Sequence, residues 1–432
     1  VIITGTLLLM LPLSAKNGAV TNFFDALFTA TSATCVTGLI VVDTYTHWTF
    51  FGQGVILSLI QIGGLGLVTL TLFFNLLIRR KLGLRTLQLA QESTSASNFE
   101  DTPRLLRGIV GISLTVEAIG AVLLLPAFVP KYGMEGIFIS VFTSVSAFCN
   151  AGFDLLGREG PYSSLIHYNG SYVLLVVSAL IIIGGLGFMV LFDLLHYHKS
   201  KKLRLHSRVV LLSTACLLFI GTLGFAALEW HNPATMGNLP VWQKLNAAFF
   251  QSVSTRTAGF NSIDIASMNE ISKVLSIGLM FIGAAPGSTG GGIKVTTIVV
   301  LIMTAVSVAR GYDDTIIMKH KIKRQVVNKS LTVVFIGFLA VLLASGVIIY
   351  TTHDGGVTAS TVDALFESTS AFATVGLSSG ITAIANLPSK LLLIATMFLG
   401  RIGPISFLLS LAAGSGKVNR KQVMPEGHLN VG

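Results

Sequence analysis

The sequence predicts an all-α polytopic membrane protein in which four similar units follow one another along the chain. The 432 residues are 52% hydrophobic and 11% charged, with a mean hydropathy of +0.77, whereas soluble proteins are typically about 25% charged. One pattern also occurs four times: a Phe, a run of small and hydroxyl residues, a Gly, and a long apolar stretch. So few charges cannot coat a soluble surface of this size, and we expect lipid to surround most of the chain.

The spanning segments are expected to be helices, because a backbone in lipid has to satisfy its own polar groups. A transmembrane helix needs about 20 mostly apolar residues. Apolar runs that suit such helices occupy residues 55–78, 109–129, 172–195, 209–228, 326–350 and 391–413.

Each unit is predicted to contain a first helix, a short helix, an extended segment with the repeat glycine, and a second helix. The first helices are expected at 1–13, 105–129, 209–230 and 327–351. The short helices are expected at 23–34, 136–148, 243–255 and 360–372. The second helices are expected at 51–78, 170–197, 272–310 and 388–412.

The short helices hold about 12 residues, which is too few to cross a bilayer, so each has to return to the side from which it came. Non-helical backbone at membrane depth is tolerated where it is buried in protein or lines water. The pattern therefore predicts four tandem helix–pore-loop–helix units around a central pore. The expected units are 1–78, 79–198, 199–310 and 311–413, followed by a cytosolic C-terminal tail at 414–432.

The segments after the short helices have the chemistry of a cation site. Inward-pointing backbone carbonyls can replace the hydration shell of a monovalent cation, and glycine readily adopts the positive φ that such a backbone requires. The negative ends of the short helices would also face the ion. The predicted ion-binding residues are Val36, Thr37, Gly38, Asn150, Ala151, Gly152, Thr257, Ala258, Gly259, Thr374, Val375 and Gly376.

The second helix of the third unit is interrupted between 283 and 294 by five glycines and a proline, which cannot continue an α-helix. A loop is therefore expected at membrane depth, where it would line the pore, with a packing kink as the alternative. A phosphate-binding loop is disfavoured because Ile293 separates Gly292 from Lys294, and Val295 stands where the motif needs Ser or Thr.

Arg401 lies inside the last apolar run, and a charge at membrane depth suggests a functional role by default. The alternative is a structural ion pair, for which Glu117, in another apolar run, is the candidate partner. Asp25 and Asp363 lie where short helices begin, so we expect them to cap these helices rather than to attract ions. Arg256 is expected to bond to loop carbonyls or to a neighbouring acid.

The net charge of +10 is gathered in four segments, each after the second helix of a unit. Positive loops mark the cytosolic face of a membrane protein. We therefore expect the basic loops and the C-terminus to be cytosolic, and we expect no nucleic-acid partner. The basic segments are 79–107, 199–208, 310–329 and 417–421.

These features resemble the Trk/Ktr/HKT superfamily of potassium transporters, most closely the Ktr membrane subunit, over essentially the whole chain. The resemblance rests on the four repeat glycines, on Thr374-Val-Gly376, and on the paired motifs at 61–66 and 182–187. It implies one selectivity-determining glycine in each loop, with K⁺ held at the filter residues. Gly38, where sodium-permeable plant relatives have Ser, implies a preference for K⁺.

The resemblance also implies roles and partners. The membrane-depth loop would gate the pore just below the filter, and Arg401 would act as an electrostatic barrier beside it. A dimer of membrane subunits, a cytosolic ring of nucleotide-binding regulatory subunits, and the bacterial cytoplasmic membrane as location are implied as well. The expected gate residues are Gly283, Ala284, Ala285, Pro286, Gly287, Ser288, Thr289, Gly290, Gly291, Gly292, Lys294 and Arg401.

The sequence therefore predicts K⁺ uptake without enzymatic activity and without a cofactor. Na⁺ stays open as a permeating, coupling or activating ion, and a sodium-permeable or Na⁺/H⁺-coupled transporter of the same fold is the main alternative. A membrane-embedded enzyme would need clustered His, Asp or Glu at membrane depth, and the sequence shows no such pattern. Cys35, Cys149 and Cys216 give neither a disulfide framework nor metal-ligand spacing.

Overall fold

The structure is a computed structural model that describes residues 1–66, 102–354 and 360–403. Within these ranges the chain is helical apart from connecting segments and one small β-ribbon, which confirms the helical fold class. Three helical segments are long and apolar enough to cross a membrane: Leu106–Tyr132, Leu205–Glu229 and Arg324–Thr352. Such segments are expected of a multi-pass membrane protein.

The helices follow the predicted order. The helices expected to come first in each unit are α1 (Ile2–Leu9), α7 (Thr102–Tyr132), α11 (Leu205–Glu229) and α15 (Arg324–Asp354). The short helices are α2 (Phe23–Cys35), α8 (Glu135–Phe148), α12 (Val241–Ser254) and α16 (Thr361–Ala373). The positions of the second helices hold α4 (Phe50–Leu65), α9 (Val173–Gly185), α10 (Phe188–Ser200), α13 (Glu270–Phe281), α14 (Val295–Ala309) and α17 (Leu387–Ile402).

Short elements complete the described chain. The ribbon pairs β1 (Ile316–Ile317) with β2 (His320–Lys321) in antiparallel register and links α14 to α15. The remaining elements are α3 (Thr44–His47) and three 3₁₀ turns at Pro12–Ser14, Ile166–Tyr168 and Thr382–Ile384. The prediction of a helix over 1–13 was too long, because Leu11, which precedes Pro12, is extended.

The prediction of one continuous second helix at 170–197 was wrong. This span is broken into α9 and α10, which meet at an angle of 99°. Gly187, between them, has a φ of +86°, a left-handed value at which an α-helix cannot continue. Gly66 and Gly403 have φ values of +82° and +91° and follow the last residues of α4 and α17. The rest of the helices expected at 51–78 and 388–412, and the tail at 414–432, lie outside the described residues.

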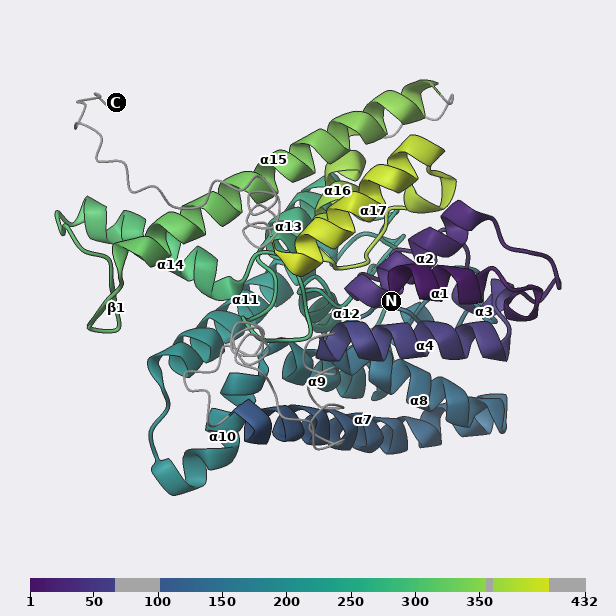
Figure 1. Cartoon of the computed structure of the whole chain (residues 1–432), viewed down its shortest axis with the longest axis horizontal. Coiled ribbons are helices and arrows are strands. Elements are labelled where there is room, and N and C mark those ends of the chain that lie inside the picture. Colours follow the sequence, from purple (N-terminus) through teal and green to yellow (C-terminus); the bar gives the residue numbers. More distant parts are fainter. Residues whose placement is uncertain (67–101, 355–359, 404–432) are drawn as a thin grey trace.

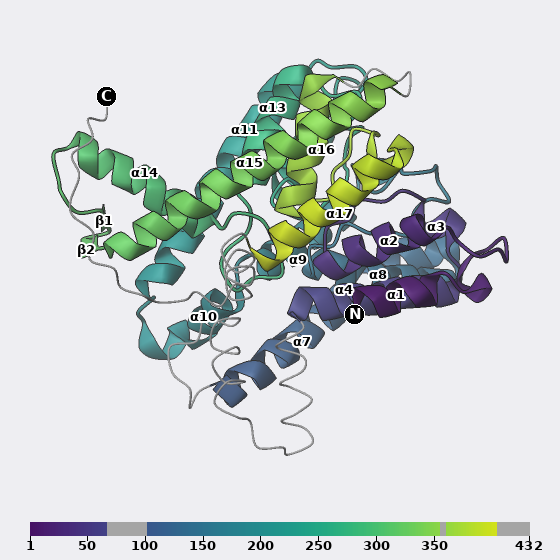
Figure 2. The same ribbon diagram turned by 45° about the horizontal axis from the view of Figure 1, so that its top comes forward.

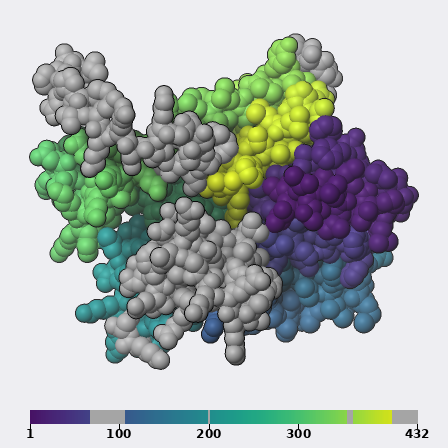
Figure 3. Space-filling view, in the orientation of Figure 1, coloured from purple at the N-terminus to yellow at the C-terminus, as the bar shows by residue number. Residues whose placement is uncertain are grey.

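The helices are arranged cyclically. Each short helix packs against a second helix from the preceding part of the chain: α8 against α4, α12 against α9, and α16 against α13. The circle closes because α2 packs against α17, near the opposite end of the sequence. Figure 3 shows α17, in yellow, between the purple N-terminal helices and the green α15. Chain ends that are far apart in sequence therefore share one core.

The Phe that opens each repeat is a core residue. Phe28, Phe142, Phe250 and Phe366 are fully buried, and each lies on a short helix. These large side chains fix the short helices to the surrounding helices, since burying an aromatic side chain contributes about 2–3 kcal/mol. Figures 1 and 2 both show the long α15 running past α16 and α17. The outer helices thus enclose the short ones.

The two ends of the helical assembly differ. The α10–α11 connection and the β1–β2 ribbon lie at one end, whereas α3 and the start of α4 lie at the other (Figure 1). The first end carries the described basic segments at 199–208 and 310–329. Charge therefore distinguishes the two ends.

Candidate ion pathway

The four repeat glycines meet in a closed ring. A Cβ atom on Gly38 would lie 2.6 Å from the carbonyl oxygen of Ala151 and 3.0 Å from the Cα of Gly152. A Cβ on Gly152 would lie 2.8 Å from the carbonyl oxygen of Ala258, beside Gly259. The same contact then continues from Gly259 to the carbonyl of Val375, and from Gly376 to the carbonyl of Thr37.

A Cβ on each ring glycine would thus lie against the carbonyl oxygen of the residue that precedes the next ring glycine. Their φ values are +92°, +69°, +79° and +94° in chain order. Glycine is needed at these positions for two reasons, because other residues disfavour this φ and because a side chain would collide with the neighbouring segment. Segments that are far apart in sequence are brought together around one point by these contacts.

A second left-handed position precedes each ring glycine by two residues. The residue types did not predict it, because Val and Thr rarely adopt positive φ and Asn alone among them does so more often. The φ values here are +57° at Val36, +58° at Asn150, +71° at Thr257 and +51° at Thr374. Each filter segment therefore has left-handed residues at its first and third positions.

The hydroxyl residues of the repeats hold these segments. The Ser32 hydroxyl accepts a hydrogen bond from the Gly38 amide, and the Ser370 hydroxyl accepts one from the Gly376 amide, both at 3.1 Å. The other two segments use the hydroxyl as a donor: Ser146 donates to the Phe153 carbonyl at 2.6 Å, and Ser254 donates to the Phe260 carbonyl at 2.5 Å. The small polar run therefore fixes the loop that follows it.

Three more glycines lie where a second helix packs closely against the end of a short helix. A Cβ on Gly63 would overlap the Thr34 carbonyl oxygen. Gly184 has the same relation to the Phe148 carbonyl, and Gly400 to that of Phe372. These glycines allow α4, α9 and α17 to contact the ends of α2, α8 and α16.

The glycine-rich loop between α13 and α14 lies against the ring segments. A Cβ on Gly290 would meet the Thr257 hydroxyl, and one on Gly291 would meet the Thr374 hydroxyl. The loop closes on itself through a hydrogen bond of 2.9 Å from the Gly283 amide to the Ile293 carbonyl. The structure thus brings this loop to the residues that begin two of the predicted filter segments.

The ends of other helices satisfy the loop backbone. The Ala285 amide donates to the Gly185 carbonyl at 3.0 Å, and the Gly292 amide donates to the Gly400 carbonyl at 3.3 Å. In the opposite direction, the Phe188 amide donates to a loop carbonyl, that of Gly287, at 3.0 Å. The break at Gly187, which the sequence analysis missed, supplies this last contact.

Arg401 bridges the loop and a distant helix. Its guanidinium donates to the carbonyl of Thr289, in the loop, and to the carbonyl of Gly63, near the end of α4. The alternative pairing with Glu117 is wrong: Glu117 accepts a hydrogen bond from Gln61 Nε2 at 3.1 Å, and no ion pair between the two groups occurs in the described part of the chain.

Two other cations also contact the loop. Lys294 Nζ donates to the carbonyls of Gly290 and Gly291 at 2.7 and 3.2 Å. Arg256 Nη2 donates to the Gly283 carbonyl at 3.4 Å, as expected for a residue that bonds loop carbonyls. Three basic side chains thus donate hydrogen bonds to carbonyl oxygens of the loop.

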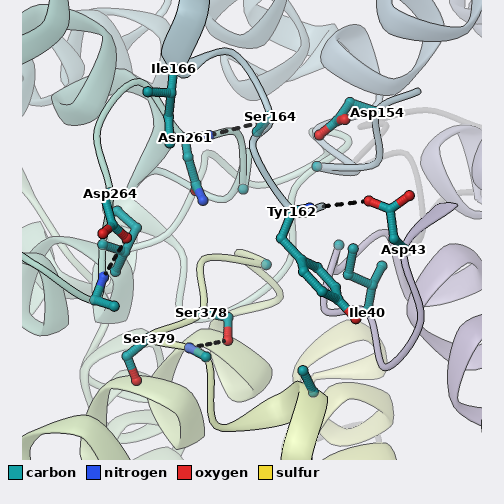
Figure 4. A pocket seen from close by; sticks show the side chains of 18 of the residues that line it. Ile40, Asp43, Asp154, Tyr162, Ser164, Ile166, Asn261, Asp264, Ser378 and Ser379 are labelled. Atoms are coloured by element: carbon teal, nitrogen blue, oxygen red, sulfur yellow. Dashed lines mark hydrogen bonds between the residues drawn. The ribbon is translucent and has the colours of Figure 1, made fainter. Parts of the chain in front are cut away.

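A pocket opens on one side of the ring. It has a volume of about 200 Å³, and all four ring glycines line it. Three carboxylates also line it, with Asp43 and Asp154 on one side and Asp264 on the other (Figure 4). Asp43 is held there by a hydrogen bond of 3.2 Å from the Tyr162 amide. Negative charge therefore surrounds the entrance to the ring.

The carboxyl group of Asp154 has a shifted pKa. It lies in the segment between α8 and α9, outside the membrane-spanning helices. Burial, together with the nearby Asp43 carboxylate, raises its pKa from 3.8 to about 6. The charge of the pocket therefore depends on pH in a range that can be tested.

A larger cavity, of about 830 Å³, contacts the glycine-rich loop. It is lined by Gly287 and Gly290 of the loop, by Lys294 and Arg401, and by Thr34 at the end of α2. The ring glycines line the first pocket, whereas the loop and its cations line this one. The first pocket is thus lined by acidic side chains and the larger cavity by basic ones.

Two ion pairs at equivalent repeat positions were not predicted. Asp25 pairs with Lys390 at 2.7 Å, and Asp363 pairs with Lys273 at 2.9 Å. Both aspartates lie in the first turns of α2 and α16, as expected for anions that a helix dipole stabilises, while the N-cap hydrogen bonds come from Asn22 and Ser360. The repeat could have indicated these ion pairs, because Lys273 precedes Gly283 by the same number of residues as Lys390 precedes Gly400.

Comparison with known proteins shows the family to which the chain belongs. The family model described as "TrkH: Cation transport protein" matches residues 1–421. The chain is 40% identical over 412 residues to "Ktr system potassium uptake protein B" of Bacillus subtilis, covering 95% of this chain and 90% of that protein. It is 37% identical over 432 residues to "Potassium/sodium uptake protein NtpJ" of Enterococcus hirae, covering 100% of this chain and 94% of that protein.

The crystal structure of "the Potassium Transporter TrkH from Vibrio parahaemolyticus" superposes with a TM-score of 0.65 at 20% identity. The match covers 91% of this chain and 79% of that one, and it shows a shared fold. The family match extends over nearly the whole sequence, and so do the two relatives. The chain therefore belongs to the TrkH family of cation transport proteins.

Proposed function

We propose that this chain takes up K⁺ across the bacterial cytoplasmic membrane through a pore at the ring of four glycines. The cyclic contact of these glycines carries the proposal, because it gathers the backbone of four segments around one axis. Carbonyl oxygens in such a position can replace the water around a dehydrated cation. Two relatives with names that specify potassium uptake support K⁺ as the ion.

In this proposal the units 1–78, 79–198, 199–310 and 311–413 each contribute one pore loop. The ion is attracted to the pocket that holds Asp43, Asp154 and Asp264. It then passes the carbonyls of the filter segments and meets the glycine-rich loop. The negative ends of α2, α8, α12 and α16, which lead into the filter segments, favour a cation there.

The loop at 283–292 acts as the gate in the proposed mechanism. Its position against Thr257 and Thr374 supports this role, and so does its tether to Arg401. The positive charges of Arg401 and Lys294 would oppose a cation while the loop stays in place. Many small residues would allow the loop to move aside at low steric cost.

Charge distribution supports the proposed orientation and partners. The end of the molecule with the basic segments at 199–208 and 310–329 would face the cytosol, with the acidic pocket outside. The Ktr resemblance favours a homodimer and a cytosolic nucleotide-binding ring as partners. We propose a transport protein, not an enzyme, that requires no cofactor.

Uptake by the purified protein in proteoliposomes, under opposing K⁺ and Na⁺ gradients, tests the proposal. The wild type should take up K⁺ in preference to Na⁺. Gly38→Ser, which would push a side chain against Ala151, should relax that preference. Gly133→Ser is the matched control, because Gly133 also has a positive φ but has open space around its Cβ position.

Three results would contradict the proposal: no K⁺ uptake by the wild type, unchanged selectivity in Gly38→Ser, or an equal change in Gly133→Ser. Equal uptake of both ions by the wild type would favour the sodium-permeable alternative. One relative is named a potassium/sodium uptake protein. The experiment therefore has to measure Na⁺ uptake as well as K⁺ uptake.

A further inference from the structure

One fully buried carboxylate lies behind the fourth filter segment. Glu367 follows the repeat Phe on α16 and is 0% exposed. Its Oε1 accepts three hydrogen bonds, from the Ser378 hydroxyl at 2.5 Å and from the amide and the hydroxyl of Thr382, both at 2.7 Å. All three donors belong to the segment that follows Gly376.

The other three repeats have no such anchor at this position. Thr29 donates to the carbonyl of Asp25 within its own helix, at 2.9 Å. The Thr143 hydroxyl and both polar atoms of Gln251 are buried without a hydrogen-bond partner in the described part of the chain. Among the repeat residues that the structure describes, the side chain after the Phe ties the short helix to its own loop at the fourth repeat alone.

The anchored segment forms part of the pathway wall. Ser378 lines the acidic pocket together with Gly376, and its hydroxyl also accepts a hydrogen bond from the Gly380 amide at 3.0 Å (Figure 4). The segment also touches two neighbours in the ring: Gly376 lies against the Thr37 carbonyl, and the Val375 carbonyl lies against Gly259. A shift of this one segment would therefore alter two of the four ring contacts.

We propose that Glu367 is a positioning residue for ion selectivity, which holds the segment from Gly376 to Thr382 at the spacing that the ring requires. This inference rests on the proposed function. Hydrogen bonds from two residues of one segment converge on one buried oxygen of α16, and together they fix the segment against the helix. Glu367 acts through Ser378 and Thr382 and does not touch the ion.

Two substitutions separate positioning from charge. In Glu367→Gln the amide oxygen can still accept the three hydrogen bonds although the carboxylate charge is lost, whereas Glu367→Ala loses both. We expect Glu367→Ala to lower the preference for K⁺ over Na⁺ about tenfold and Glu367→Gln to stay within about twofold of the wild type. Gln251→Ala, at the equivalent position without a partner, is the control and should keep the wild-type preference.

Substitutions in the segment that follows Gly376 provide a second test, which leaves the sequence of α16 unchanged. Ser378→Ala combined with Thr382→Val removes the two hydroxyl donors and should also lower the K⁺ preference. Adding Glu367→Ala to this pair should produce less than the product of the two separate effects, because the groups act in one network. Uptake is measured in proteoliposomes at equal amounts of reconstituted protein, and the half-saturating K⁺ concentration is recorded separately from the maximal rate.

Several results would overturn the inference. Glu367→Ala with an unchanged ion preference and a lower maximal rate alone would make Glu367 a packing residue. A loss in Glu367→Gln as large as that in Glu367→Ala would assign the effect to charge. If Glu367→Ala fails to fold, normal selectivity in the Ser378/Thr382 variant refutes positioning. Failure of wild-type K⁺ uptake would instead refute the proposed function itself.

Discussion

At the scale of single residues, the glycines explain both what the sequence could predict and what it could not. The ring positions of Gly38, Gly152, Gly259 and Gly376 could be singled out because the repeat places each after a similar polar run. The left-handed conformations of Val36 and Thr374 could not, because these residue types avoid positive φ unless the surrounding structure imposes it. Glu367 also escaped notice, because its three partners become neighbours only when the loop folds back onto α16.

Asp154 gives a prediction at the same scale. Since its pKa is raised to about 6, the carboxyl is charged above that pH and neutral below it. Lowering the outside pH from about 7.5 to about 5 removes one negative charge from the pocket, and the half-saturating K⁺ concentration should rise by about twofold to fivefold. The measurement is K⁺ uptake at a series of outside pH values with the inside pH held constant.

Asp154→Asn should remove most of this pH dependence and leave affinity low throughout. Asp314→Asn is the control, because Asp314 forms an exposed pair with Lys321 in the basic segment at the opposite end of the molecule. An Asp154→Asn protein that keeps the wild-type pH profile would show that another group is responsible.

At the scale of elements, one break in the second helices could be predicted and another could not. The break between α13 and α14 could be anticipated, because five glycines and a proline fall in twelve residues, 283–294. The break between α9 and α10 was missed, because the residues around Gly187 are apolar and compatible with a continuous helix. There the tertiary contact from the Phe188 amide to the Gly287 carbonyl compensates for the lost helical bonds.

The tether of the glycine-rich loop leads to a prediction about gating. Arg401→Ala removes the donors to Thr289 and Gly63, so the loop should leave its position more often. We expect the maximal K⁺ uptake rate to rise severalfold with the K⁺ preference retained, because Arg401 lines the larger cavity whereas the ring glycines line the other pocket. The measurement is initial uptake in proteoliposomes. Arg310→Ala, at an exposed arginine after α14, is the control. An unchanged rate in Arg401→Ala would argue against a gate at this loop.

The two ion pairs between elements predict a difference in stability. The pair of Asp25 and Lys390 joins α2 to α17, and its side chains are 25% and 19% exposed. Lys390→Met leaves the Asp25 carboxylate without its partner, so we expect a loss of about 1–2 kcal/mol. Thermal unfolding in detergent should show a lower midpoint. Exchanging the two residues, Asp25→Lys with Lys390→Asp, should restore part of the loss.

Lys321→Met is the matched control for this prediction. Lys321 pairs with Asp314 at 2.6 Å, but the two side chains are 68% and 48% exposed. Exposed ion pairs contribute little, because water already solvates both charges. Equal midpoints for Lys390→Met and the wild type would mean that the α2–α17 contact does not depend on the ion pair.

At the scale of the whole molecule, four distant segments of one chain form a cyclic structure. The repeat made this closure predictable in outline, since four similar units can be arranged around an axis. It did not predict differences between units such as the buried carboxylate that anchors the fourth loop. These differences depend on single substitutions within the repeat, which a periodic pattern does not reveal.

We expect a cation to bind where the four glycine segments meet. Anomalous diffraction from crystals grown with Rb⁺, a heavier analogue of K⁺, can locate it. We predict an anomalous peak on the ring axis, within coordination distance of the carbonyl oxygens of Thr37, Ala151, Ala258 and Val375, and a weaker peak after exchange into K⁺. Rb⁺ bound elsewhere in the protein, with no peak at the ring, would show that the ring is not a cation site.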